Sequence, residues 1–275
     1  MLADVVSLMW LPFLACLILA SIHVYLGLHV IAREVIFVDI ALAQMAALGA
    51  TVAFLFGHEL ESATAYWTSL GFTLAGAAVF SMTRTRERRV SQEAVIGVVY
   101  VVSAAAAIVL VDRAPHGAEH IKAILVGSLL TVTPALVAKT ALLYAAIGLF
   151  HYWARRTFLL ISTDPEEAHR QGLAVRWWDF LFYASFGAVV TRSVRIAGVL
   201  LVFAYLIVPA LAGAAWGSGW RTRLVFGWTL AAAVSLAGIV TSASLDIPTG
   251  ATIVCAFGLA LLAVWGLAAA RRPAS

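Results

Sequence analysis

The chain has 275 residues, of which 63% are apolar and 12% are charged, and its formal net charge is +4. A soluble domain has about 25% charged residues, and a bilayer core about 30 Å thick needs about 20 apolar residues for each helix that crosses it. The chain repeats apolar runs of that length between short charged loops, which excludes a soluble fold and indicates an all-α polytopic membrane protein.

Nine apolar segments predict about nine transmembrane helices, with eight as the alternative. The alternative arises from the sixth segment, because its roughly 13 residues span only about 20 Å unless the helix continues toward Arg195. The runs are continuous rather than alternating, which excludes a membrane β-barrel. The segments are Leu8–Ile31, Val35–Phe56, Ala63–Met82, Ala94–Val111, Pro134–Tyr152, Trp178–Val190, Ile196–Ala215, Leu224–Ile239 and Ala251–Ala269.

Arginine residues gather in every second loop and predict the orientation. Cytoplasmic loops of membrane proteins carry an excess of Lys and Arg, so we expect the N-terminus outside and the C-terminus inside a bacterial cytoplasmic membrane. Cations placed between apolar runs indicate topology and contact with lipid, and not binding of nucleic acid. The arginines on the predicted inner side are Arg33, Arg84, Arg86, Arg88, Arg89, Arg155, Arg156, Arg170, Arg176, Arg221, Arg223, Arg271 and Arg272.

We expect one membrane domain over residues 1–275, with two connections that are too long to be simple turns. The outer connection covers about residues 112–133 and the inner one about residues 153–177. Long ordered loops usually carry function.

The second predicted helix contains a carboxylate, Asp39, and an amide, Gln44. A carboxylate in a membrane helix is costly and usually faces an interior or a water path. Asp39 is therefore a candidate for a transport pathway, and the alternative is an ion pair with Arg33 near the inner surface. Gln44 offers a weak carbonyl ligand, or a hydrogen bond between packed helices.

The outer connection contains a candidate metal site. His116, Glu119 and His120 are three and four residues apart, which places them on one face if the segment is helical, and their donor atoms suit zinc. The alternative is a polar loop exposed to solvent. The same spacing matches a zinc-peptidase motif, but the helices supply no evident third ligand, so we expect no such catalysis.

The inner connection predicts a short polar helix. Thr163 or Asp164 suits its cap, Pro165 its first position, and Gly172 a left-handed residue after its end. Such a helix fits a groove on a partner protein, although an ordinary capped surface helix is the alternative. The chain has no Gly-rich phosphate loop, so any use of ATP requires a separate subunit on the inner side.

Several short motifs resemble those of one transporter family. Asp164-Pro165-Glu166 followed by Ala168 and Gly172 resembles the coupling segment of permeases in metal-ion ABC importers of the zinc, manganese and iron type. Gly198–Val202 with Leu206–Ala210, which includes Pro209, resembles that family's "GxLLV…LLIxPA" helix. Gln92–Gly97 and Gly127-Ser128 resemble two further elements, in the same order along the chain.

This resemblance implies the other components of a transporter complex. The fold would be that of a type II ABC importer permease, non-catalytic and without a bound cofactor. The chain would pair with a second permease copy, bind two ATPase subunits inside, and receive a divalent metal from an extracytoplasmic binding protein. Gly198 and Pro209 would belong to the gate, and transport would proceed by alternating access. The competing interpretation is a secondary transporter driven by an ion gradient, which usually needs several ionisable groups at mid-membrane depth.

The chain departs from the family in its second helix. Family members usually carry an Asp and a His there, four residues apart, and this sequence has Ile40 and Gln44 in those positions. Asp39 lies one place early, which rotates it about 100° around the helix. The usual pair of metal contacts is therefore absent or rearranged, and the sequence does not reveal the metal.

Overall fold

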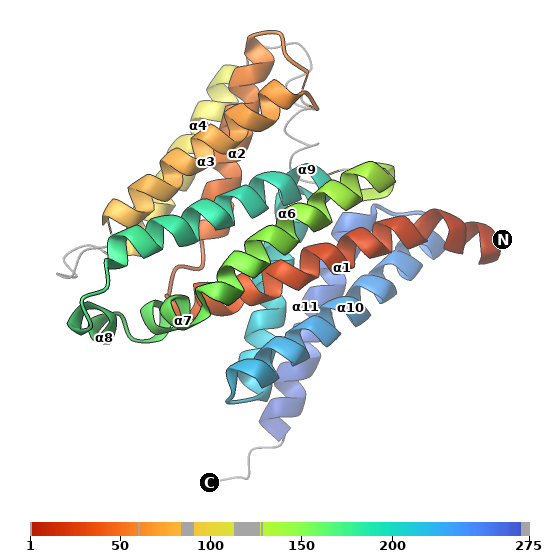
Figure 1. The fold of residues 1–275 in the computed structure, drawn as a ribbon. Coiled ribbons are helices and arrows are strands. Elements are labelled where there is room, and N and C mark those ends of the chain that lie inside the picture. The colour runs from red at the N-terminus through yellow and green to blue at the C-terminus, as the bar shows by residue number, and fades with distance from the viewer. Residues whose placement is uncertain (1, 60, 84–90, 113–126, 128, 271–275) are drawn as a thin grey trace. The chain divides into compact units, whose positions relative to one another are not determined.

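A computed structural model describes residues 2–59, 61–83, 91–112, 127 and 129–270, without the side chains of residues 2–8. The described residues are helical, with no strand among them (Figure 1). The elements are α1 (Leu2–Ala32), α2 (Val38–Leu55), α3 (Ala63–Thr83), α4 (Gln92–Val111), η1 (Leu129–Thr131), α6 (Pro134–Trp153), α7 (Arg155–Thr163), α8 (Pro165–Arg170), α9 (Val175–Trp216), α10 (Trp220–Leu245) and α11 (Thr249–Ala270).

The sixth and seventh predicted segments both lie in α9. Gly198 interrupts this helix with φ 74° and ψ 164°, so α9 consists of two helices joined at a kink. Its first part, residues 175–197, measures about 35 Å at about 1.5 Å per residue. The helix therefore continues beyond Val190 toward Arg195, which is the condition under which the sixth predicted segment is long enough to cross a bilayer. With α9 counted as two, the described part of the chain contains the nine apolar helices of the prediction.

Seven helices of the described residues are long and apolar enough to cross a membrane, and α3 is not among them. Several of the seven leave large apolar side chains uncovered; on α4, Val101 is 60% exposed, and on α11, Leu259 is 70% exposed. A soluble protein rarely exposes such surfaces, whereas lipid covers them at no cost. The burial pattern therefore agrees with the membrane class that the composition indicates.

The inner connection is more helical than predicted. The sequence indicated one short helix between Trp153 and Trp177, and the structure has two, α7 and α8. The additional helix α7 is amphipathic, since Phe158 and Ile161 are buried while Arg155 and Arg156 are exposed. Packing of this apolar face stabilises the helical conformation of Arg155–Thr163, which the polarity of the segment had assigned to a loop.

The described residues divide into two compact units. One comprises those of Met1–Ile31, Val126–Ala145 and Ile196–Ser275, and the other those of Ala32–Leu125 and Ala146–Arg195. The chain passes from the second unit to the first within α9, three residues before Gly198.

Glycine residues allow close helix packing in the first unit. A Cβ on Gly27 of α1 would lie 1.9 Å from the carbonyl oxygen of Leu206 in α9. A Cβ on Gly227 of α10 would lie 2.6 Å from Val24 and 3.2 Å from the carbonyl oxygen of Pro209. Small residues let membrane helices approach through their backbones, so the helix after the kink is tightly enclosed by α1 and α10.

In the second unit, α2 packs against both α3 and α4 (Figure 1). Gly49 of α2 lies against the backbone of Thr68 and Ser69 in α3. At the start of α4, the hydroxyl of Ser91 accepts a hydrogen bond from the backbone N–H of Ala94 at 3.2 Å. This cap fixes the first turn of α4, which contains Gln92 and Glu93.

Candidate functional site

The segment Asp164–Gly172, here called the coupling segment, forms the predicted helix α8. The Asp164 carboxylate accepts a hydrogen bond from the backbone N–H of Glu167 at 2.9 Å, and Pro165 occupies the first helical position. Thr163 was the alternative cap, but its hydroxyl donates to the carbonyl of Leu159 at 2.9 Å. Asp164 is therefore the cap, and it satisfies a backbone donor that the helix leaves unpaired.

The coupling segment ends as its glycine predicts. Gly172 has φ 74°, and its N–H donates to the carbonyl of His169 at 3.0 Å. The N–H of Leu173 donates to the carbonyl of Ala168 at 3.1 Å. This pair of bonds is the Schellman motif, which needs a left-handed residue at the position of Gly172.

One face of α8 is anchored and the other is free. Ala168 is fully buried in a small apolar cluster with Ile161 and Val175, against which Leu173 and Trp178 pack. Glu166 and His169 are exposed on the opposite side. Helix α8 is thus a polar projection with both ends capped and an apolar base that joins α7 to α9.

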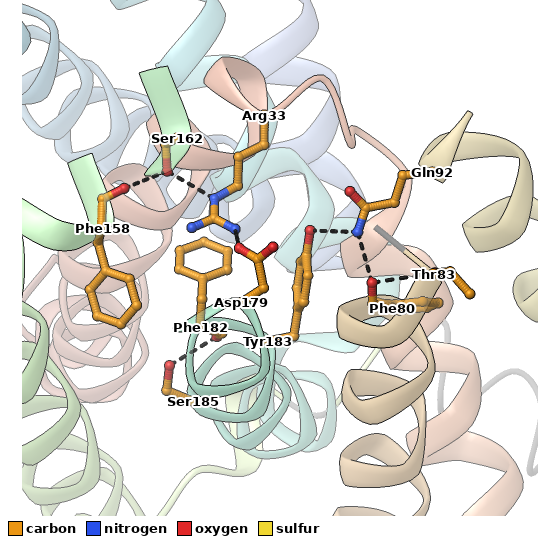
Figure 2. A network of polar contacts seen from close by, with 10 residues as sticks. All are labelled: Arg33, Phe80, Thr83, Gln92, Phe158, Ser162, Asp179, Phe182, Tyr183 and Ser185. Atoms are coloured by element: carbon orange, nitrogen blue, oxygen red, sulfur yellow. Dashed lines mark hydrogen bonds and ion pairs between the residues drawn. The ribbon is translucent and has the colours of Figure 1, made fainter. Parts of the chain in front are cut away.

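Beneath this projection lies a buried ion pair that the sequence analysis did not identify. Arg33 Nη1 donates to Asp179 Oδ1 at 2.6 Å, and both side chains are 0% exposed. Arg33 Nε donates to the hydroxyl of Ser162 at 2.8 Å, and the guanidinium carbon lies 4.0 Å from the centre of the Phe182 ring (Figure 2). The sequence feature that could have indicated this ion pair is the single carboxylate in the sixth apolar segment, Asp179, which lies in Trp177-Trp178-Asp179-Phe180.

The residues at the start of α4 join the same region. Gln92 Nε2 donates to the Tyr183 hydroxyl and to the carbonyl of Phe80, each at 3.0 Å (Figure 2). Glu93 accepts a hydrogen bond from the backbone N–H of Phe37, just before α2, at 3.0 Å. The motif at residues 92–97 therefore connects the starts of α2 and α4 to the end of α3 and to α9.

Asp39 does not pair with Arg33, so that alternative is wrong. Arg33 binds Asp179, while Asp39 is fully buried and neither of its carboxylate oxygens has a hydrogen-bond partner among the described residues. Gln44 is half-buried, and five residues place it about 140° around α2 from Asp39. The two side chains therefore do not share a face of the helix.

Two motifs that are far apart in the sequence meet at the kink of α9. Gly127 has φ 71°, and a Cβ there would lie 2.2 Å from the backbone nitrogen of Gly198. Gly198 itself adopts a backbone conformation that is essentially restricted to glycine. Pro209, eleven residues later, has no N–H and leaves the carbonyl of Tyr205 without its usual helical donor.

No cluster of three or more potential metal-binding side chains occurs among the described residues. The candidates His116, Glu119 and His120 lie outside the described residues. His23 Nδ1 is 2.7 Å from the carbonyl oxygen of Leu19, and the ring of His29 contacts Tyr25 and Trp220. These two histidines therefore have structural contacts within the first unit.

The model of the ABC 3 transport family matches residues 6–267. A "Probable iron transport system membrane protein" of Haemophilus influenzae is 26% identical over 60% of this chain and 61% of its own length, so the match spans about three fifths of that protein. A "Probable metal transport system membrane protein" of Thermotoga maritima is 25% identical over 88% of this chain and 83% of its own length.

The fold is also found among solved structures. The structure described as "PsaBC from Streptococcus pneumoniae in complex with Fab" superimposes with a TM-score of 0.79 over 96% of this chain and 95% of that chain, at 20% sequence identity. At that identity the match establishes the fold alone.

Proposed function

The chain belongs to the ABC 3 transport family, and we propose that it is the membrane-spanning permease subunit of an ATP-driven importer for a divalent metal ion. Its relatives include proteins named for iron transport and for metal transport. Manganese, iron and zinc are the candidate cargoes, because they share ligand types. Residues 1–275 make up the permease domain of this proposal, which lies in the bacterial inner membrane.

The observation that carries the proposal is the construction of the coupling segment. Asp164, Pro165 and Gly172 fix both ends of α8, and Ala168 buries its base. Because both ends are held, a force on the exposed face around Glu166 moves the whole helix with its base and does not merely unwind it. ATPase subunits on the cytoplasmic side would supply this force, and this chain would hydrolyse no ATP itself.

In this proposal Asp39 of α2 belongs to the transport pathway, and Gly198 and Pro209 are the gate residues. Gln44, on another face of α2, would make a hydrogen bond between packed helices. Asp39 offers the cargo two carboxylate oxygens that have no partner among the described residues. The kink at Gly198 gives the enclosed helix a natural point of bending. Transport would proceed by alternating access, and His116, Glu119 and His120 would be a metal-binding group on the outer side.

The proposed assembly has a second permease copy and an extracytoplasmic metal-binding protein. The N-terminus would lie outside and the C-terminus in the cytoplasm, as the arginine distribution predicts. This orientation places the coupling segment on the side where ATP is available.

The test is ATP hydrolysis by this chain co-purified with its ATPase in lipid, with and without metal-loaded binding protein. Stimulation by one metal form would support the proposal and identify the cargo. Glu166→Gln should abolish the stimulation. The matched control is Asp246→Asn, which removes an exposed carboxylate outside the coupling segment and should retain it.

Failure to form a complex with any ATPase would overturn the proposal. A transporter driven by an ion gradient would then be the better interpretation, and uptake driven by an imposed gradient in vesicles of the chain alone would identify it.

A further inference from the structure

The two ends of the coupling segment are attached to a single buried side chain. Arg33 Nε donates to Ser162, two residues before Asp164, and Arg33 Nη1 donates to Asp179, seven residues after Gly172. Figure 2 shows the guanidinium between these two partners. All of these residues belong to the same compact unit.

The environment of Arg33 makes these contacts costly to break. The side chains of Arg33 and Asp179 are 0% exposed, so loss of either partner leaves an uncompensated buried charge. The Ser162 hydroxyl donates to the carbonyl of Phe158 at 2.8 Å and therefore presents a lone pair to Arg33. The guanidinium holds its donors in a rigid planar fork, so movement of α7 and α9 at these points must carry Arg33 with it.

Arg33 also lies at the start of the connection to α2. Helix α1 ends at Ala32 and α2 begins at Val38, so only a short turn separates Arg33 from Asp39 in the first turn of α2. The N–H of Phe37 is held by Glu93 at 3.0 Å, and the N–H of Val38 donates to the carbonyl of Val35 at 3.2 Å. These two hydrogen bonds hold the connection at its α2 end, so Arg33 is joined to the first turn of α2 by a short, partly fixed segment.

We propose that Arg33 is a positioning residue that transmits displacement of the coupling segment to the start of α2 and thus to Asp39. This inference rests on the proposed function and specifies how ATP-driven motion would reach the pathway. Arg33 touches neither nucleotide nor metal in this scheme, and it acts through Ser162 and Asp179 on one side and the α1–α2 connection on the other.

The test compares metal uptake with ATP hydrolysis in the same vesicles containing the full complex. Asp179→Asn and the double variant R33M/D179L should lower uptake per ATP hydrolysed by about tenfold, within the range typical of coupling between sites. The double variant guards against misfolding, because it removes both charges together and keeps the buried volume. A purely structural role would lower uptake and hydrolysis in proportion and leave their ratio unchanged, which would overturn the proposal.

Thr73→Val is the matched control. It removes the buried hydroxyl contact between Thr73 and Thr191, which lie 3.2 Å apart and join α3 to α9 in the same unit. This contact involves neither flank of the coupling segment, so the ratio of uptake to hydrolysis should stay at the wild-type value. An equal fall in the control would also overturn the proposal.

A second measurement uses the chain without its partners. Hydrogen exchange in detergent should rise together in residues 164–174 and residues 34–38 of D179N, and in neither segment of T73V. A rise confined to one segment would overturn the linkage. If the wild-type complex hydrolysed ATP without metal uptake, the proposed function would fail, and the exchange measurement would still decide the linkage.

Discussion

At the scale of single residues, the described part of the second unit contains two fully buried carboxylates in different surroundings. Asp179 accepts a charged hydrogen bond from Arg33 at 2.6 Å. Asp39 has no hydrogen-bond partner for either oxygen among the described residues. A buried charge is usually paired, and an unpaired one is costly. The presence of a carboxylate at Asp39 therefore needs an explanation other than stability, and binding of a cation is the explanation in our proposal.

The two aspartates should respond differently to the same substitution, as measured by the free energy of unfolding. Asp179→Asn leaves Arg33 without its ionic partner and should lower the free energy of unfolding by about 3 kcal/mol. Asp39→Asn removes an unpaired charge and should change that free energy by less than about 1 kcal/mol, or raise it. Thermal unfolding in detergent measures both, and a larger loss for Asp39→Asn would show that its carboxylate has a structural partner.

Metal uptake should depend on Asp39 much more strongly than the free energy of unfolding does. If its carboxylate contacts the cargo, Asp39→Asn should lower uptake by about tenfold or more, because a neutral amide binds a divalent cation less well. Uptake of radioactive metal into vesicles is the measurement. Retention of wild-type uptake would remove Asp39 from the pathway and leave the rest of the proposed function in place.

At the scale of elements, α8 owes its shape to a few local contacts. Asp164 caps its start, the turn at Gly172 closes its end, and Ala168 fills its base. Among the described residues, no tertiary neighbour lies within 4 Å of a Cβ built on Gly172. The need for glycine there is therefore conformational, and it is set by the positive φ alone.

Gly172→Ala should destabilise the end of α8 by about 1–2 kcal/mol, the cost of a left-handed backbone for an L-residue. Faster hydrogen exchange in residues 164–174 and weaker binding of the ATPase would be the observed results. Gly148→Ala is the control, because Gly148 is helical and also has nothing within 4 Å. Equal effects of the two substitutions would contradict the role of the left-handed turn.

The packing of α1 against the second part of α9 gives another prediction at this scale. Gly27→Ala would place a Cβ 1.9 Å from the backbone oxygen of Leu206, so the helices must separate, at a cost of about 1–3 kcal/mol or more. Gly258→Ala in the same unit adds a methyl group where nothing lies within 4 Å and should be neutral. Thermal unfolding of both variants measures these effects. An unchanged stability of Gly27→Ala would contradict the close approach of α1 to the second part of α9.

At the scale of the whole molecule, the apolar surface and the arginine distribution together describe a protein in a membrane. Large side chains of α4, α6 and α11 such as Val101, Leu142 and Leu259 are mostly exposed, which suits lipid and not water. Seven helices of the described residues have the length and composition of membrane spans. The proposed orientation assigns each loop to one side of the membrane.

Labelling of single cysteines tests this orientation. With Cys16 and Cys255 replaced by Ala, a membrane-impermeant maleimide should label His58→Cys in intact cells and Glu166→Cys only after permeabilisation. Both positions are exposed in the structure, so access depends on the side of the membrane. The reverse pattern would invert the orientation and place the coupling segment away from ATP.

The sequence by itself determined the membrane class, the positions of the apolar helices and the form of α8. These features depend on local chemistry: the length of an apolar run, an aspartate before a proline, and a glycine where a helix ends. The same local reasoning assigned Trp153–Trp177 to a loop with one helix, and it missed α7, whose stability depends on packing of its apolar face.

Only the tertiary structure decided which partners the buried polar groups have. Arg33 and Asp179 are 146 residues apart in the chain, and the closer carboxylate, Asp39, was the partner that sequence distance suggested. Likewise, the contact of Gly127 with Gly198 arises where two separate segments meet. Periodicity tells which residues lie inside a helix bundle, but the choice of partner there depends on how helices distant in sequence pack against one another.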